Sequence, residues 1–272
     1  MNSFSGHGPI PSIQAPNDVV GSQDVSEVLL AASVDRRGIL AAVFLTLASN
    51  ARSEALTSKE TSMPHVVLLG DSVFDNAAYV GGGPDVVQQV RAVLPEDWQA
   101  SLLAVDGDVI ADVPRQLGRL PENTTHLVVS VGGNDALRAS TVLERSARSV
   151  AEAVAALAEV RERFQAEYRA MLDAIQATAR PAALCTIYDP RYTDPQRRRL
   201  ATTALTLLND SITREAFARG LSLIDLRVLC GEDADFANPI EPSIEGGRKI
   251  ANAVAAFLHA RPEQLSSRVF AR

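Results

Sequence analysis

The sequence predicts an α/β protein in which a five-stranded, mainly parallel sheet lies between two layers of helices, giving three layers. Two observations lead to this fold class. The segments 66–70 (VVLLG) and 127–131 (LVVSV) are continuous apolar runs, as expected of strands that are buried on both faces. From residue 65 onward such runs alternate with longer segments of helical periodicity, and strands that alternate with helices form a parallel sheet covered on both sides.

The individual elements follow from the same periodicities. Five strands are expected, at 66–70, about 100–104, 127–131, 183–188 and 221–226. Helices are expected near 84–93, over 140–179, from about 195 to 218 and from about 245 to 258, and Gly220 stands where a helix C-cap is needed. The helical region 140–179 is predicted to bury one stripe of apolar side chains, formed by Val150, Val154, Leu157, Val160, Phe164, Tyr168 and Leu172.

The chain is expected to divide into three parts. We predict an N-terminal extension over 1–63, an α/β domain over 64–262 and a C-terminal tail over 263–272. The first 22 residues are rich in Gly, Pro, Ser and Asn and have no apolar periodicity, a composition typical of disorder. Residues 24–55 carry apolar side chains at helical spacing, which predicts an amphipathic helix or a pair of helices.

The same stretch also contains Arg36-Arg37 ahead of a short apolar run, which resembles a twin-arginine export signal. The apolar run is short and a long leader precedes the arginines, so an accessory helix and a cytoplasmic location are favoured, with export as the alternative. No segment reaches the 18 or more apolar residues expected of a membrane-spanning helix.

Composition excludes several classes of partner. The net charge of −7 argues against nucleic acid, because binding to a phosphate backbone requires clustered Lys and Arg. The one dense basic run, Arg197-Arg198-Arg199, is interpreted as the solvated side of a helix start. Cys185 and Cys230 lie in apolar contexts without metal-ligand spacing, so we expect buried thiols, no metal and no cofactor. The sequence gives no indication of oligomeric state.

The chemistry of the chain is expected just after the strands, because ligands of such sheets bind at the carboxyl ends of the strands. Gly70-Asp71-Ser72 follows the first strand, Val105-Asp106-Gly107 follows the second segment, and Gly132-Gly133-Asn134-Asp135 follows the third. A fourth block, Asn238-Pro239-Ile240-Glu241, precedes the last helix.

In order and approximate spacing these four blocks resemble the SGNH (GDSL-type) hydrolase family, from residue 64 to about 260. The resemblance implies a flavodoxin-like three-layer fold and the hydrolysis of a small-molecule acyl ester. It assigns the nucleophile to Ser72, at a tight turn where its hydroxyl is exposed for attack. It assigns the oxyanion hole to the backbone N–H groups of Ser72 and Gly107 and to the side-chain amide of Asn134, which donates without adding a charge.

The fourth block departs from the family pattern. The family has Asp-x-x-His at this place, with the histidine as general base, whereas this chain has Asn238 and Glu241. Glu241 is predicted to accept the Ser72 proton, and partial burial would raise its pKa toward a useful range; the alternative is a charge at the start of the last helix, favoured by the helix dipole. Supporting roles are expected for Asp71, Asp75 and Asn238.

No histidine is expected to replace the missing base. His65 and His126 begin strands and should lie at the opposite end of the sheet from Ser72, as surface or edge residues. His7 falls in the leader and His259 ends the last helix.

The sequence leaves three functions open. The first is a serine ester hydrolase that uses Ser72 and Glu241. The second is a catalytically impaired member of the same fold that binds a small ligand without turnover. The third, a nucleotide or phosphate binder built on Gly81-Gly82-Gly83, lacks the Lys-Ser/Thr of a phosphate loop.

Overall fold

The computed structural model describes residues 63–260. The helix and arginine pair expected within residues 24–55, and the expected boundary and tail beyond residue 260, lie outside the described residues. The extension and tail therefore stay predictions.

The described residues form a five-stranded parallel sheet in the order β2-β1-β3-β4-β5. This confirms the predicted fold class. All four strand pairings are parallel. The strands span His65–Gly70 (β1), Gln99–Leu102 (β2), His126–Ser130 (β3), Ala182–Cys185 (β4) and Ser222–Ile224 (β5).

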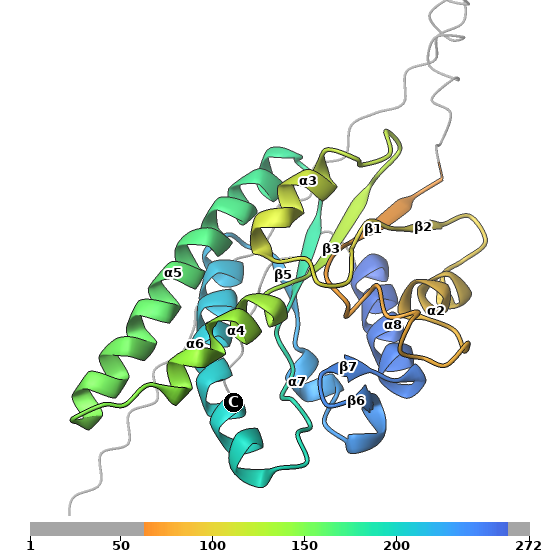
Figure 1. The fold of residues 1–272 in the computed structure, drawn as a ribbon. Helices are drawn as coiled ribbons and strands as arrows, with labels where there is room; N and C mark the ends of the chain where they lie inside the picture. Colours follow the sequence, from red (N-terminus) through yellow and green to blue (C-terminus); the bar gives the residue numbers. More distant parts are fainter. Residues whose placement is uncertain (1–62, 261–272) are drawn as a thin grey trace, which may run out of the picture. The chain divides into compact units, whose positions relative to one another are not determined.

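Helices cover both faces of the sheet, and the alternation of side chains along β1 shows why. Val66 and Leu68 pack into one core cluster with residues of α2 and α8, while Val67 and Leu69 pack into a second cluster with residues of α3, α5 and α6. Figure 1 shows α2 and α8 on one side of the strands and α3, α5 and α6 on the other. The helices span Val86–Val93 (α2), Val113–Leu117 (α3), Val150–Ala177 (α5), Pro195–Ala218 (α6) and Ile244–His259 (α8).

Shorter elements line the carboxyl edge of the sheet. The antiparallel pair β6-β7 and the short helices before it were not predicted, because two- and three-residue strands leave no periodic signal. The bounds are Ile110–Asp112 (η1), Gly133–Ala139 (α4), Ser140–Glu144 (η2), Leu226–Leu229 (α7), Asp233–Asp235 (η3), Phe236–Asn238 (β6) and Glu241–Pro242 (β7).

The predicted stripe of the 140–179 region is partly wrong. The region is a 3-10 turn, a break and then α5, and Val150 and Val154 are 81% and 57% exposed. Phe164, Tyr168 and Leu172 are buried as predicted. Helical periodicity indicates that one face of the helix is apolar, but it does not indicate over what length another element packs against that face.

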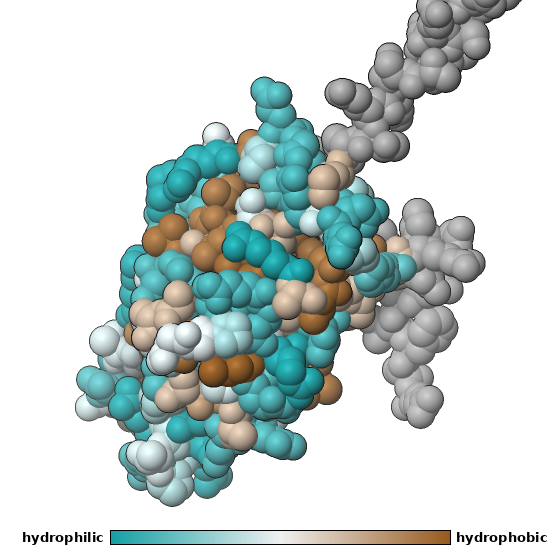
Figure 2. All heavy atoms as spheres, turned by 90° about the vertical axis from the view of Figure 1, so that its right-hand side faces the viewer, coloured by the Kyte–Doolittle hydropathy of each residue, from teal (hydrophilic) through white to brown (hydrophobic). Residues whose placement is uncertain are grey.

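Hydrophilic residues predominate on the face of the molecule in Figure 2, where apolar patches are interrupted by polar side chains. Within residues 63–260 no helix combines the length and the apolarity that crossing a bilayer requires.

Candidate active site

Ser72 lies on a tight turn directly after β1. Gly70 begins the turn with φ +122°, and a Cβ there would come within 1.7 Å of the Ser130 carbonyl oxygen on β3. The position therefore requires glycine. The Asp71 N–H donates to the same Ser130 oxygen at 3.0 Å, and the Asp71 carboxyl accepts from the Val73 N–H at 3.2 Å. Asp71 thus shapes the turn that presents Ser72.

The structure brings Ser72 and Glu241 together from positions 169 residues apart. The Ser72 hydroxyl donates to Oε1 of Glu241 at 3.0 Å, and both side chains are buried. The second carboxylate oxygen of Glu241 has no hydrogen-bond partner among the described residues. Glu241 does not sit at the start of the last helix, because Ser243 caps α8.

The loop that carries Glu241 is held by its neighbours. Oδ1 of Asn238 accepts from the N–H groups of Ile240 and Glu241 at 2.9 and 3.0 Å. The Tyr188 hydroxyl donates to the Ile240 carbonyl at 2.5 Å, and the Arg191 N–H donates to the Pro239 carbonyl at 2.7 Å. Asn238 therefore orders the loop from within, and the chain after β4 anchors it from outside.

A further brace links this loop to the nucleophile turn. Nδ2 of the fully buried Asn76 donates to the Pro242 carbonyl at 3.1 Å, and its Oδ1 accepts from the Val86 N–H at 2.9 Å. The turn after Ser72, the start of α2 and the Glu241 loop are thereby tied together.

The two carboxyl groups beside Ser72 are both less acidic than usual. Burial raises the pKa of Glu241 to about 7, opposed by the hydrogen bond from Ser72 and assisted by the negative charge of Asp106. Burial also raises the pKa of Asp71 to about 8, opposed by the Val73 amide and assisted by the charge of Glu241. A carboxyl group with a pKa near 7 is suited to exchange protons at neutral pH.

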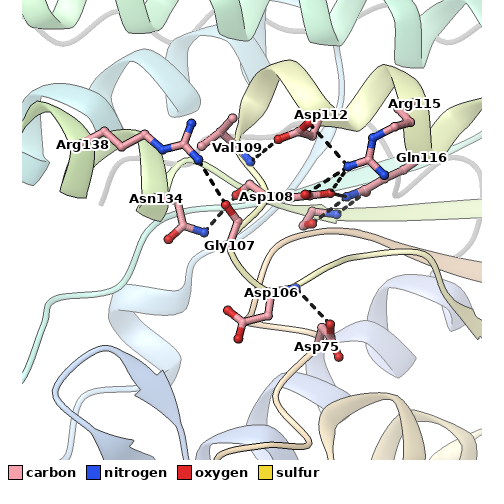
Figure 3. Close-up of polar contacts among 11 residues, drawn as sticks. Asp75, Asp106, Gly107, Asp108, Val109, Asp112, Arg115, Gln116, Asn134 and Arg138 are labelled. Atoms are coloured by element: carbon pink, nitrogen blue, oxygen red, sulfur yellow. Dashed lines mark hydrogen bonds and ion pairs between the residues drawn. The ribbon is translucent and has the colours of Figure 1, made fainter.

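Gly107 occupies an exposed turn that begins beside the end of β1, where the Val105 N–H donates to the Gly70 carbonyl at 3.1 Å. The Asp108 N–H donates to the Val105 carbonyl at 3.1 Å, and Gly107 has φ +84°, as the third position of a type II turn requires. Asp75 holds this turn by accepting from the Asp106 N–H at 2.9 Å (Figure 3). Among the described residues, the Gly107 N–H has no hydrogen-bond partner.

Asn134 points its amide at the same turn. The side chain stands in the first turn of α4, whose N-cap Gly132 has φ +119°, and Nδ2 donates to the Asp108 carbonyl at 2.9 Å. Figure 3 shows the Asn134 amide beside Gly107. Since an amide nitrogen carries two protons, one N–H of Asn134 remains for a ligand.

Gln116 of α3 was missed by sequence reasoning. It is fully buried; its Nε2 donates to the Gly70 carbonyl and to Asp108, and its Oε1 accepts from the Gly70 N–H, all at 2.8 Å. It therefore fixes the spacing between the end of β1 and the Gly107 turn. A single glutamine in a five-residue helix gives no sequence signal for such a role.

The histidines lie away from Ser72. His65 and His126 begin β1 and β3, at the opposite end of the sheet from the turn. The expectation that His65 is a surface residue is wrong: it is 4% exposed, with its ring nitrogens 2.9 and 2.8 Å from Asn123 Oδ1 and Ser101 Oγ. His259 is exposed at the end of α8.

A cavity of about 130 Å³ opens beside Ser72 and Glu241. Asp71 and Asn134 also line it, and the remaining wall comes from the segment after β3, the first half of α5, the loop after β4 and α6. No histidine lines the cavity. Within residues 63–260, no group of His, Cys, Asp and Glu side chains is arranged to hold a metal ion, and both cysteines are free and buried.

Residues 68–249, more than half of the chain, match the sequence model of the GDSL-like lipase/acylhydrolase family. None of the curated proteins matches the sequence significantly.

Solved structures share the fold. An extracellular lipase from Streptomyces rimosus is 17% identical with a TM-score of 0.53, covering 71% of this chain and 99% of its own. Phospholipase A1 from Streptomyces albidoflavus is 16% identical with a TM-score of 0.52, with the same coverage. The acetyl xylan esterase AlAXEase is 17% identical with a TM-score of 0.53, covering 71% of this chain and 98% of its own.

Proposed function

The chain belongs to the GDSL-like lipase/acylhydrolase family, whose members act on esters, and from this premise we propose that it is a serine ester hydrolase with Ser72 as nucleophile and Glu241 as general base. The observation that carries the proposal is the hydrogen bond of 3.0 Å from the Ser72 hydroxyl to Glu241. A nucleophile and a base within hydrogen-bond reach are the basic arrangement of acyl transfer. The pKa of about 7 suits Glu241 to that task.

The reaction proceeds in two halves. The Ser72 oxygen attacks the ester carbonyl carbon while its proton passes to the Glu241 carboxylate. The protonated Glu241 then donates to the alkoxide oxygen as the carbon–oxygen bond breaks, and the alcohol leaves an acyl-serine. Water attacks this acyl group with its proton going to Glu241, and the proton returns to the Ser72 oxygen as the acid departs.

The negative charge on the carbonyl oxygen requires preorganised donors. We assign them to the N–H groups of Ser72 and Gly107 and to the free N–H of Asn134. The unpartnered Gly107 amide and the placement of Asn134 beside the Gly107 turn support this assignment. We assign Asp71, Asp75 and Asn238 to positioning these groups, through the hydrogen bonds that hold the Ser72 turn, the Gly107 turn and the Glu241 loop.

The test is hydrolysis of p-nitrophenyl acetate and butyrate by the wild type, Ser72→Ala and Glu241→Gln. We expect Ser72→Ala to lose on the order of 10³-fold or more in kcat and Glu241→Gln on the order of 10²–10⁴-fold. Ser146→Ala and Glu159→Gln, at exposed positions, serve as matched controls and keep the wild-type rate. A Ser72→Ala rate equal to that of the wild type contradicts the proposal.

The second candidate is a protein of this fold that binds a ligand without turnover. The absence of histidine from the cavity lining favours it. It predicts stabilisation by a ligand, no ester hydrolysis and no labelling of Ser72 by a fluorophosphonate. Stoichiometric labelling that Ser72→Ala abolishes supports the hydrolase instead.

A further inference from the structure

Apolar side chains predominate in the lining of the cavity beside Ser72. Its charged lining residues are Asp71 and Glu241, and it has no Lys or Arg. Its other polar residues are uncharged: Ser130, Ser140, Thr186, Tyr188 and Tyr192, besides Ser72 and Asn134. The part formed by α5 and α6 is entirely apolar, consisting of Leu157, Val160, Ala201, Ala204, Leu205, Leu207 and Leu208. Such a surface offers no hydrogen bond to a sugar and no positive charge to a phosphate, and it gains free energy by covering an aliphatic chain.

Two of the smallest lining side chains stand together on α6. Ala201 and Ala204 are three residues apart and therefore share a helix face; Leu205 and Leu208 continue the same stripe. A helix face that alternates alanine with leucine in this way leaves room beside the alanines. Any larger side chain at these two positions would occupy the space that the cavity contains.

The outer wall of the cavity is partly exposed to solvent. From Gly133 to Arg163 no residue is buried, and Leu137 and Leu143 line the cavity while remaining 39% and 38% exposed. In Figure 1 this segment runs from α4 to the first half of α5. A chain in the cavity would remove these apolar side chains from water.

The Gly107 turn, which does not line the cavity, is open and polar. Asp106 and Gly107 are exposed, and Asp106 accepts from the Tyr79 hydroxyl at 2.7 Å. In the proposed reaction the alcohol must leave to solvent while the acyl group stays on Ser72. The open turn therefore suits the alcohol and the apolar cavity suits the acyl group.

We propose, on the basis of the proposed function, that this cavity binds the aliphatic acyl chain of the substrate and that Ala201 and Ala204 determine the chain length it accepts. The preferred substrates are then esters of linear fatty acids rather than acetates.

The first experiment measures kcat/KM for p-nitrophenyl esters from acetate to decanoate. Each methylene buried in the cavity is expected to raise kcat/KM by about fourfold until the cavity is filled. In Ala204→Phe and Ala201→Phe the ratio of octanoate to acetate kcat/KM should fall at least tenfold. Ala155→Phe, at an exposed position of α5 outside the cavity lining, keeps the wild-type ratio.

The second experiment measures ligand binding in the absence of turnover, as a shift in Tm. Octanamide, which is neutral, should raise the Tm of the wild type more than acetamide does, and Ala204→Phe should lose that difference. Circular dichroism confirms that each variant is folded, and Leu157→Ala, which enlarges the cavity, should shift the preference to longer chains.

The outcomes separate the two proposals. If the wild type hydrolyses no ester but octanamide stabilises it in an Ala204-dependent way, the proposed hydrolase function fails and the cavity assignment holds. If the wild type hydrolyses all chain lengths equally, or folded Ala204→Phe keeps the wild-type ratio, the cavity assignment is overturned and the hydrolase remains. A rate that depends on the length of the alcohol instead of the acid also overturns the assignment.

Discussion

The loop that carries Glu241 and the turn that carries Gly107 differ in the hydrogen bonds that hold them in place. Below, they are called the side of Glu241 and the side of Gly107. On the side of Glu241 the hydroxyl already donates to the carboxylate, and Asn238, Tyr188 and Asn76 hold the loop from buried or half-buried positions. On the side of Gly107 the turn is exposed, and the Asn134 amide is bonded to the chain's own Asp108 carbonyl.

This difference indicates that the two halves of the site reach their working state differently. The pairing of Ser72 and Glu241 exists before substrate arrives. In the proposed reaction, the donors assigned to the oxyanion would meet their acceptor only when charge develops on the substrate, where such interactions accelerate a reaction most.

Removing the Asn134 amide tests the exposed Gly107 turn and should lower kcat more than the change of pH or the tyrosine substitutions below. Asn134→Ala is expected to lower kcat on the order of 10²–10³-fold with KM little changed, because the lost bond is strong only in the transition state. Ester kinetics with Asn252→Ala, an exposed asparagine on α8, as the control checks this. An equal rise in KM at unchanged kcat would place Asn134 in ground-state binding.

The pH profile tests the buried side. Burial raises the pKa of Glu241 to about 7, so the ionised form of this proposed base is lost as pH falls through 7. We expect kcat/KM to fall about tenfold between pH 6 and pH 5. In Asp71→Asn this acidic limb should persist, because Asp71, with its pKa raised to about 8, is already protonated there. An acidic limb that survives in Glu241→Gln would assign it to another group.

The same ionisation predicts a stability effect that opposes activity. Because the folded pKa of Glu241 lies above its ordinary value of 4.5, the folded state binds more protons than the unfolded state between these two values, and this group's contribution to stability is lost as pH rises through that window. Glu241→Gln should therefore gain in Tm relative to the wild type from pH 5 to pH 8.

Substitution of two tyrosines, one on each side, should produce the smallest changes in kcat and compares the two sides directly. Tyr188→Phe removes the hydrogen bond to the Ile240 carbonyl. It should lower kcat several-fold, up to about tenfold, because the loop that carries Glu241 is then held less firmly. Tyr79→Phe removes the exposed bond to Asp106 and should change kcat less than about twofold. Equal effects of the two variants would remove the distinction between the sides.

The sequence predicted the sheet and the four blocks because buried parallel strands are continuous apolar runs and because functional residues follow strand ends. Ser72 and Glu241 lay within these blocks and do meet. Gln116 and Tyr188 could not be predicted, since their contacts depend on which elements pack together. The prediction that Val150 and Val154 are buried was wrong for a related reason. Their spacing is that of a buried stripe, but α5 extends beyond the elements that it packs against.

The separation of 169 residues between Ser72 and its partner has a consequence for how activity arises during folding. β1 can pair with β3 long before β7 exists on a growing chain, so a nascent or C-terminally shortened chain would display the hydroxyl without its proton acceptor. Such distant contacts form late in folding. The return of ester hydrolysis after dilution from denaturant would therefore report the docking of the last hairpin and helix, and not the appearance of the sheet.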